Sequence, residues 1–558
     1  MRTTLLAVLF LLPEAASAAE TPLPPIVFQT QPIGRILDDL RLGADIIGGE
    51  KGVKALNEGF KQLLGEKGLE GLDISRPMIG YVVLAAKPQD ITAVIAFPIT
   101  GEKEFLGLCD RVNKDKLKVD ASDKALYHMP PLEPQYKALM RFKNRYAYIA
   151  YGANPAPHIE LTALVPMEKL YDPAERGLIA ARLHVERIPL PVLLAARSWM
   201  DEVKKQFAGK GIGQQEEVIL KPVMAELEKL ATRYIKSAAD IESIAARLLI
   251  DAPTGNLIVE ATLAGKPNSE LAKTIAAFKP TPHRFSALAA HPDTVGALTF
   301  RLPLYEAELR AAAVLGLEAA EKEAQNSNDP GKAAGEELFR SLARTARVGE
   351  LDLALAVRGP DKDGWFTVLG ALACDDTKAL EKAYRDFIDK NPEKAGGETR
   401  WDVAKGGNVS IHTLKLTPGG FLDPSKVLGG ENCMIAFAFA PKGVFVAMGP
   451  DAVGTLKEAL AVKPAPAPAL EILLNPVRTT QLIQKIMGPD DPDISDVELV
   501  LGNENKLRSI LSATLEGGKE LRAAITINLK VLPRAALHGA IKRAAEEKSD
   551  LPPKPVEK

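Results

Sequence analysis

One pattern constrains the fold of this chain more than any other: a short apolar strand, a proline and an amphipathic helix, written four times. The copies read "VFQTQPIGRILDDL", "HVERIPLPVLLAARSW", "TFRLPLYEAELRAA" and "EILLNPVRTTQLIQ". Proline cannot continue a central strand but suits the first turn of a helix, so it predicts the point where each strand gives way to a helix. The four prolines are Pro32, Pro189, Pro303 and Pro476. Four copies in a fixed order indicate internal duplication.

Each copy continues, after a region of variable length, into two strands joined by a tight turn and then a helix. The third copy shows it most clearly, with "ELDLALAVR", the turn "GPDKDG", "WFTVLGALA" and the helix "TKALEKAYRDFI". The strands are rich in apolar residues, the connections are rich in Gly, Pro and Asp, and the helix carries apolar residues at helical spacing. We therefore expect four β-α-β-β-α units, at about 26–112, 179–279, 296–391 and 469–547.

The units pair into two halves, because a similar stretch of strand, loop and glycine-ended hairpin follows the first and the third unit. Proline-spaced linkers such as "KPTPHRF" favour extended chain between the parts. We expect an α+β fold of two homologous halves, with largely antiparallel sheets and helices on one face. The predicted segments are a signal peptide at 1–19, halves at 20–285 and 286–548, and a Pro/Lys-rich disordered tail at 549–558.

The first residues have the features of an export signal: Arg2, an apolar run from Leu5 to Leu12, and Ala16 and Ala18 at the spacing of a cleavage site. We expect a secreted or periplasmic protein with no membrane span. The formal net charge is -2 and only 5% of residues are aromatic, which argues against nucleic-acid binding. In an oxidising compartment Cys374 and Cys433 could form a disulfide, but three small buried hydrophobic residues, with Cys109, are the simpler interpretation.

Catalytic signatures are missing from the sequence. The zinc-hydrolase motifs H-E-x-x-H and H-x-x-E-H do not occur, nor does a G-x-S-x-G nucleophile elbow. Four α+β units in two halves resemble the pitrilysin-type metallopeptidases in outline only, since their zinc ligands are missing. Among seven scattered histidines the nearest pair is His283 and His291. The sequence predicts no catalytic residue and no cofactor.

Two stretches are weak candidates for binding. The acidic loop "GPDDPDISDVE" offers several carboxylates of the kind that calcium binds, although its spacing is not that of an EF-hand and a solvated turn with a helix cap is the simpler interpretation. The loop's candidate ligands are Asp490, Asp491, Asp493 and Asp496. In "RYAYIAYG" the rings of Tyr146 and Tyr148 share one face of a strand, where they would form either a binding platform or half-buried sheet residues.

The signal peptide, the repeated α+β units and the Arg76–Pro77 step before a hairpin resemble uncharacterised secreted bacterial proteins of the domain-of-unknown-function type. The resemblance implies the fold and brings no site residues with it. Three functions stay open. The first is an exported, non-catalytic binding or scaffold protein for an unknown protein, an envelope polymer or an apolar ligand. The second is a carrier of a lipid or other apolar ligand, with an apolar cavity of roughly several hundred Å³ between sheet and helices. The third is an exported hydrolase whose site forms only in three dimensions.

Overall fold

The computed structural model has mixed α+β architecture dominated by antiparallel pairing. It describes residues 23–85, 87, 90–112, 117–130, 133–189, 191–192, 225–226, 229, 240–304, 307–328, 331–391, 397–416, 427–488 and 511–529. By its internal contacts the chain divides into unit 1, residues 1–38 and 55–203, and unit 2, residues 39–54 and 204–558. The boundary predicted near residue 285 falls inside unit 2. The predicted signal peptide and C-terminal tail lie outside the described residues.

Unit 1 contains one antiparallel ladder in the order β8-β1-β2-β3-β7-β6-β5-β4. Its described strands are β1 (Ile26–Pro32), β2 (Pro77–Val83), β3 (Thr92–Pro98), β4 (Lys118–Val119), β5 (Leu126–Met129), β6 (Lys137–Lys143), β7 (Tyr146–Gly152) and β8 (Ile179–His184). Its helices are α1 (Ile33–Leu64), whose middle belongs to unit 2, α2 (Glu102–Val112) and α3 (Ala156–Ile159), with single 3₁₀ turns at Met167–Lys169 and Val185–Arg187.

Unit 2 contains a longer antiparallel ladder in the order β9-β10-β22-β21-β20-β12-β13-β14-β18-β17-β16-β15. Its described strands are β9 (Ile241–Asp251), β10 (Asn256–Gly265), β12 (Thr294–Pro303), β13 (Glu350–Arg358), β14 (Thr367–Ala373), β15 (Gly397–Gly406), β16 (Val409–Leu416), β17 (Met434–Ala440), β18 (Gly443–Gly449), β20 (Leu470–Leu474), β21 (Leu511–Glu516) and β22 (Leu521–Asn528). A separate pair joins β11 (Thr281–His283) to β19 (Ala465–Ala467).

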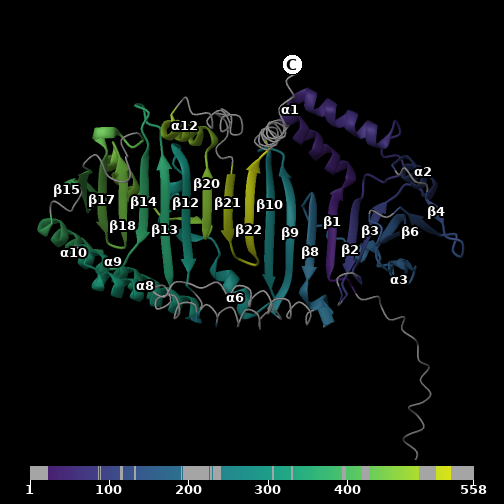
Figure 1. Ribbon diagram of the computed structural model, residues 1–558, viewed down its shortest axis with the longest axis horizontal. Coiled ribbons are helices and arrows are strands. Elements are labelled where there is room, and N and C mark those ends of the chain that lie inside the picture. Colours follow the sequence, from purple (N-terminus) through teal and green to yellow (C-terminus); the bar gives the residue numbers. More distant parts are fainter. Residues whose placement is uncertain are drawn as a thin grey trace, which may run out of the picture. The chain divides into compact units, whose positions relative to one another are not determined.

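Four described helices of unit 2 begin at a side chain that accepts a hydrogen bond from the first turn, and these caps are Ser269, Asp376, Asp451 and Asn475. Its described helices are α6 (Glu270–Ala277), α7 (Ser286–Ala289), α8 (Ala307–Asn326), α9 (Lys332–Val348), α10 (Thr377–Lys390), α11 (Ala452–Ala461) and α12 (Pro476–Met487), with a 3₁₀ turn at Gly430–Asn432. The Asn475 side chain accepts a hydrogen bond from the Arg478 N–H, and Pro476 occupies the first turn as its sequence context predicts. In Figure 1, α8, α9 and α10 lie along one end of the strands of unit 2, and α12 lies at the other end.

Helices contact both faces of the sheets, so the expectation of helices on one face is wrong. In unit 1, Phe105 and Leu108 of α2 pack with Ala147, whereas Ile159 of α3 packs with Tyr148. Adjacent residues of a strand point to opposite faces. The physical reason is that β7 is an apolar run without alternation, as strands buried on both faces are.

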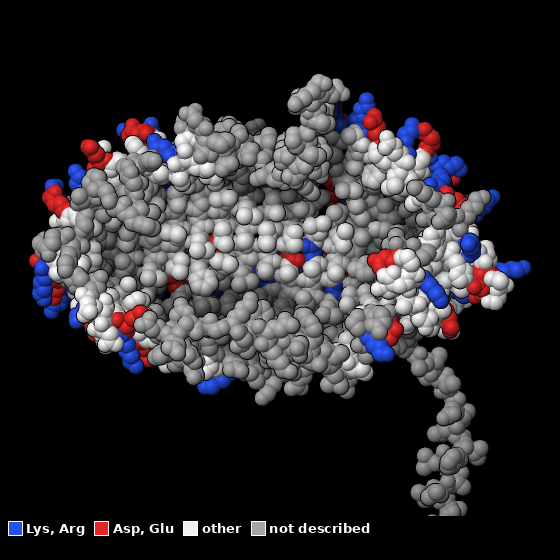
Figure 2. Space-filling model, viewed as in Figure 1, with Lys and Arg blue, Asp and Glu red and all other residues white. Residues whose placement is uncertain are grey.

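The closed face of the unit 2 sheet, as we name it, carries the core and is lined by small residues. Ala354 and Ala371 pack there against Leu288 of α7 and Leu456 of α11. Small side chains let the helices approach the sheet closely. On the side that Figure 2 shows, few of the Lys, Arg, Asp and Glu residues drawn in colour lie over the middle of the strands of unit 2. No helix among the described residues is long and apolar enough to cross a membrane.

Candidate functional site

The opposite side of the unit 2 sheet, which we call the open face, carries three parallel rows of apolar side chains. Each row crosses nine neighbouring strands, from β9 to β18, and each step is a direct cross-strand pair. The central row is Leu248, Val259, Ile525, Ala513, Ile472, Leu298, Leu355, Gly370 and Val446. The two flanking rows are Ile250, Leu257, Ile527, Leu511, Leu474, Gly296, Val357, Val368 and Met448, and Ala246, Ala261, Ala523, Leu515, Leu470, Phe300, Leu353, Leu372 and Val444.

None of these residues is buried, although all are apolar. In the central row Val259 is 47% exposed, Ile525 48% and Leu355 47%. Two neighbours on the same strands, which point to the closed face, are buried: Ala524 is 8% exposed and Ala354 4%. Isolated exposed apolar residues are ordinary, but a contiguous set on one sheet face is not.

The dimensions of the open face follow from strand geometry. Neighbouring strands lie about 4.8 Å apart, so nine strands extend roughly 38 Å across the sheet. Rows two residues apart along a strand are separated by about 7 Å, so the three rows together are about 14 Å wide. The resulting area, on the order of 500 Å², reaches the size at which apolar patches on soluble proteins mark interaction sites.

Helices approach the open face near its edges. Tyr384 of α10 packs against Phe437 and Phe439 of β17, with ring centroids 5.2 and 6.3 Å apart. Because Phe437 pairs directly with Val446, α10 covers the sheet just beyond the end of the central row. Leu482 of α12 packs in the cluster that holds Val357, Val368 and Met448, at the end of one flanking row. Between these two places, no described helix is recorded in a hydrophobic cluster with the residues of the central row.

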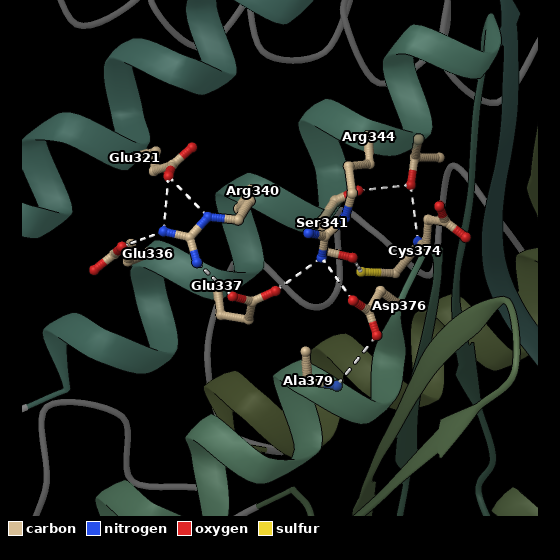
Figure 3. Close-up of polar contacts among 11 residues, drawn as sticks. Glu321, Glu336, Glu337, Arg340, Ser341, Arg344, Cys374, Asp376 and Ala379 are labelled. Atoms are coloured by element: carbon tan, nitrogen blue, oxygen red, sulfur yellow. Dashed lines mark hydrogen bonds and ion pairs between the residues drawn. The ribbon is translucent and has the colours of Figure 1, made fainter.

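Polar contacts fix the helices α8, α9 and α10 to one another (Figure 3). The Arg340 guanidinium donates to Glu321 at 3.0 Å and to Glu337 at 2.7 Å, and it also contacts Glu336. Arg344 donates to Glu337 at 2.8 Å and lies 3.4 Å from Asp376, the N-cap residue of α10. These pairs tie the three helices together.

The cysteines are three free, buried thiols, as the simpler interpretation predicted. The Cys374 sulfur lies 2.9 Å from the Ser341 hydroxyl. Burial raises the pKa of the thiols of Cys374 and Cys433, and that of Cys109 to about 11. A protonated, buried thiol is a poor nucleophile, so the cysteines serve as core residues.

A buried polar group lies on the closed face, where His283 is 3.3 Å from Asp352 and Arg301 pairs across the strands with Asp352. The His283 ring is fully buried, and its Nδ1 accepts a hydrogen bond from the Phe285 N–H. Burial and the positive charge of Arg301 lower the pKa of His283 to about 4, so the ring is neutral at pH 7. The buried Ser286 hydroxyl lies 3.3 Å from the His283 carbonyl and 3.1 Å from the Ala465 carbonyl. These contacts, with the sealed and neutral imidazole, order the β11 segment.

The tyrosine candidates from the sequence are core residues of unit 1. Tyr146 and Tyr148 are 3% and 0% exposed and lie in the core of unit 1, so neither presents a ring to a ligand. The Tyr148 hydroxyl donates to the Val165 carbonyl at 3.4 Å. The acidic loop with Asp490, Asp491, Asp493 and Asp496 lies outside the described residues. Within the described part of the chain, no group of His, Cys, Asp and Glu is placed to hold a metal ion.

The apolar surface is an open face and not the enclosed cavity that a carrier was expected to have. A cavity of about 320 Å³ lies on the closed side, but its lining includes His291, Glu471 and Asn475 and is therefore mixed. The sequence did carry a signal for the open face. In "ELDLALAVR" the large residues Leu351, Leu353, Leu355 and Val357 alternate with Asp352, Ala354, Ala356 and Arg358. The large apolar residues lie on the open face, and the residues between them are buried on the closed face. In most strands the large apolar residues are the buried ones.

Comparisons of the chain with protein-family models, with curated proteins and with solved structures found no match.

Proposed function

We propose that this protein is an exported, non-catalytic carrier that holds the hydrocarbon chains of a lipid on the open face of unit 2. The observation that carries the proposal is the central row, where five large side chains are between 38% and 48% exposed while residues of the closed face such as Ala354 and Ala524 are buried. The five are Val259, Leu355, Val446, Ile472 and Ile525. Leaving such a surface in water forgoes about 25 cal/mol for each Å² of apolar area. A bound apolar ligand would recover that free energy.

The chemistry of the face favours a hydrocarbon chain over a peptide. No side chain in the three rows carries a charge or a hydrogen-bonding group, and eight of the nine strands beneath, all except β9, are paired on both sides. A peptide lying there would lose water from its N–H and C=O groups without gaining partners, at a cost of about 1–3 kcal/mol for each group. A hydrocarbon chain has no such groups and bears no such cost.

The length of the face also fits. The hydrocarbon core of a bilayer is about 30 Å thick and contains two acyl chains end to end. The central row, at roughly 38 Å, is long enough for that arrangement across the strands. The predicted export signal agrees with a carrier that works outside the cytoplasm, where lipids must cross an aqueous space.

The pairing pattern supports the proposal that the two halves are duplicates. In unit 1, β1 lies between β8 and β2, and in unit 2, β12 lies between β20 and β13. The antiparallel pair of β10 and β22 is nearly symmetric in its register. Asn256 at the start of β10 pairs with Asn528 at the end of β22, and Leu521 at the start of β22 pairs with Leu263 near the end of β10. Duplication of one β-α-β-β-α unit would produce both features.

Photo-crosslinking with a fatty acid that carries a photoreactive group along its chain tests the carrier proposal. After irradiation and digestion, we expect labelled peptides from β10, β13, β18 and β22, which contribute the most exposed residues of the central row. Labels confined to other segments, or a protein that takes up no label, would overturn it.

A further inference from the structure

Gly370 of β14 leaves a notch in the central row. It pairs with Leu355 on one side and with Val446 on the other, whose side chains are 47% and 41% exposed. The row therefore has two apolar walls at this point and no side chain between them. Every other position in the row has at least a Cβ atom.

Neither the backbone nor the packing of the protein requires glycine at this position. Its φ lies outside the positive range, and a Cβ added there would meet no atom within 4 Å. Glycine in the interior of a strand costs about 0.5–1 kcal/mol relative to alanine, and it often marks a place where a ligand comes close to the backbone.

Gly80 in unit 1 provides a contrast. A Cβ at Gly80 would clash with the ring of Phe28, which pairs with it across β1 and β2. The notch over Gly80 is thus filled by the protein's own aromatic ring. The notch over Gly370 has no such occupant, so its shape is available to a ligand on the open face.

We propose that the Gly370 notch receives a bend or branch of the bound chain, which makes the preferred ligands cis-unsaturated or methyl-branched chains in place of straight saturated ones. This inference rests on the carrier function proposed above. A straight chain lying along the row passes over the notch and leaves a void, and the walls then lose their dispersion contacts. A bent chain fills the notch and contacts both Leu355 and Val446.

Competition between oleate and stearate, which have chains of equal length, tests this with the full mature protein and the variants Gly370→Val and Ala181→Val. Wild type should prefer oleate, by about tenfold if the fit resembles that of one methylene group in an apolar pocket. Gly370→Val should abolish the preference by weakening oleate binding. Ala181 is an exposed strand residue of β8 outside the three rows, so Ala181→Val should leave the preference intact.

A stability measurement guards against misfolding as the explanation. Valine suits a strand better than glycine and meets no neighbour here, so Gly370→Val should unfold at the same or a higher urea concentration than wild type. Equal affinity of wild type for the two chains, or a preference that survives Gly370→Val, would overturn the notch proposal and leave the carrier proposal standing. Binding of neither chain by wild type would instead overturn the carrier proposal.

Discussion

Replacing Val259 with aspartate places a carboxylate in the middle of the open face and should abolish most lipid binding. Full burial of a valine side chain is worth about 1.5–3 kcal/mol, so covering the 47% of Val259 that is exposed contributes about 1 kcal/mol. Desolvating the new carboxylate without a partner adds about 1–3 kcal/mol to the loss. A total of about 2 kcal/mol or more corresponds to binding that is weaker by about 30-fold or more.

Displacement of a fluorescent fatty acid provides the assay, and Val403→Asp provides the matched control. Val403 is also a strand valine, it is 43% exposed, and it lies in the irregular part of β15 outside the three rows. Both changes place aspartate in a strand, so both should lower the free energy of unfolding by a similar amount, about 1 kcal/mol or less. The reasoning is refuted if Val259→Asp binds as tightly as Val403→Asp.

Three further predictions concern the fold. In the folded protein the pKa of buried His283 is about 4, so below pH 6.5 the unfolded chain binds a proton at this residue that the folded chain does not. The free energy of unfolding should therefore fall by up to about 3 kcal/mol between pH 6.5 and pH 4. His283→Gln should reduce this pH dependence in urea unfolding, and an unchanged dependence would contradict the assignment. Gly80→Val should destabilise the protein by about 1–3 kcal/mol in urea unfolding because the new side chain clashes with Phe28, and no loss would show that the ring is not held there. A thiol reagent should modify none of the cysteines until urea unfolds the chain, and fast labelling of the native protein would contradict their burial; the residues are Cys109, Cys374 and Cys433.

The sequence predicted the local elements well because their signals are local. Turns rich in Gly, Pro and Asp mark the hairpins of β9 with β10 and of β13 with β14, and Pro476 marks the start of α12. The duplicated arrangement of these elements stays a prediction. Periodicity of 2 or 3.6 residues reports only which side chains share a face.

Which face is covered could not be predicted in the same way. In "AAITINL" the residues Ile525 and Ile527 share a face, and such a pattern usually indicates the buried side of a strand. The structure has the opposite arrangement, since Ala524 is buried and Ile525 is 48% exposed. The outcome depends on where α7, α10, α11 and α12 pack, and those contacts join segments far apart in the chain.

The candidate site was hidden for the same reason. Its central row takes one residue from each of nine strands spread between Leu248 and Ile525, and no sequence motif connects them. The tyrosines Tyr146 and Tyr148 were visible as a motif, but the packing of α3 and the following segment buries them. A search for residues with binding or catalytic side chains therefore could not find this surface, because its residues carry no polar or charged groups.

Native mass spectrometry of the mature protein, purified gently from the exported fraction of its own host, tests the central claim most directly. The carrier account predicts a protein with additional mass of lipid size that is lost on denaturation and yields hydrocarbon chains on extraction. A bare monomer mass would contradict it. A bare dimer would also contradict it, because a second copy would then be the partner that covers the open face.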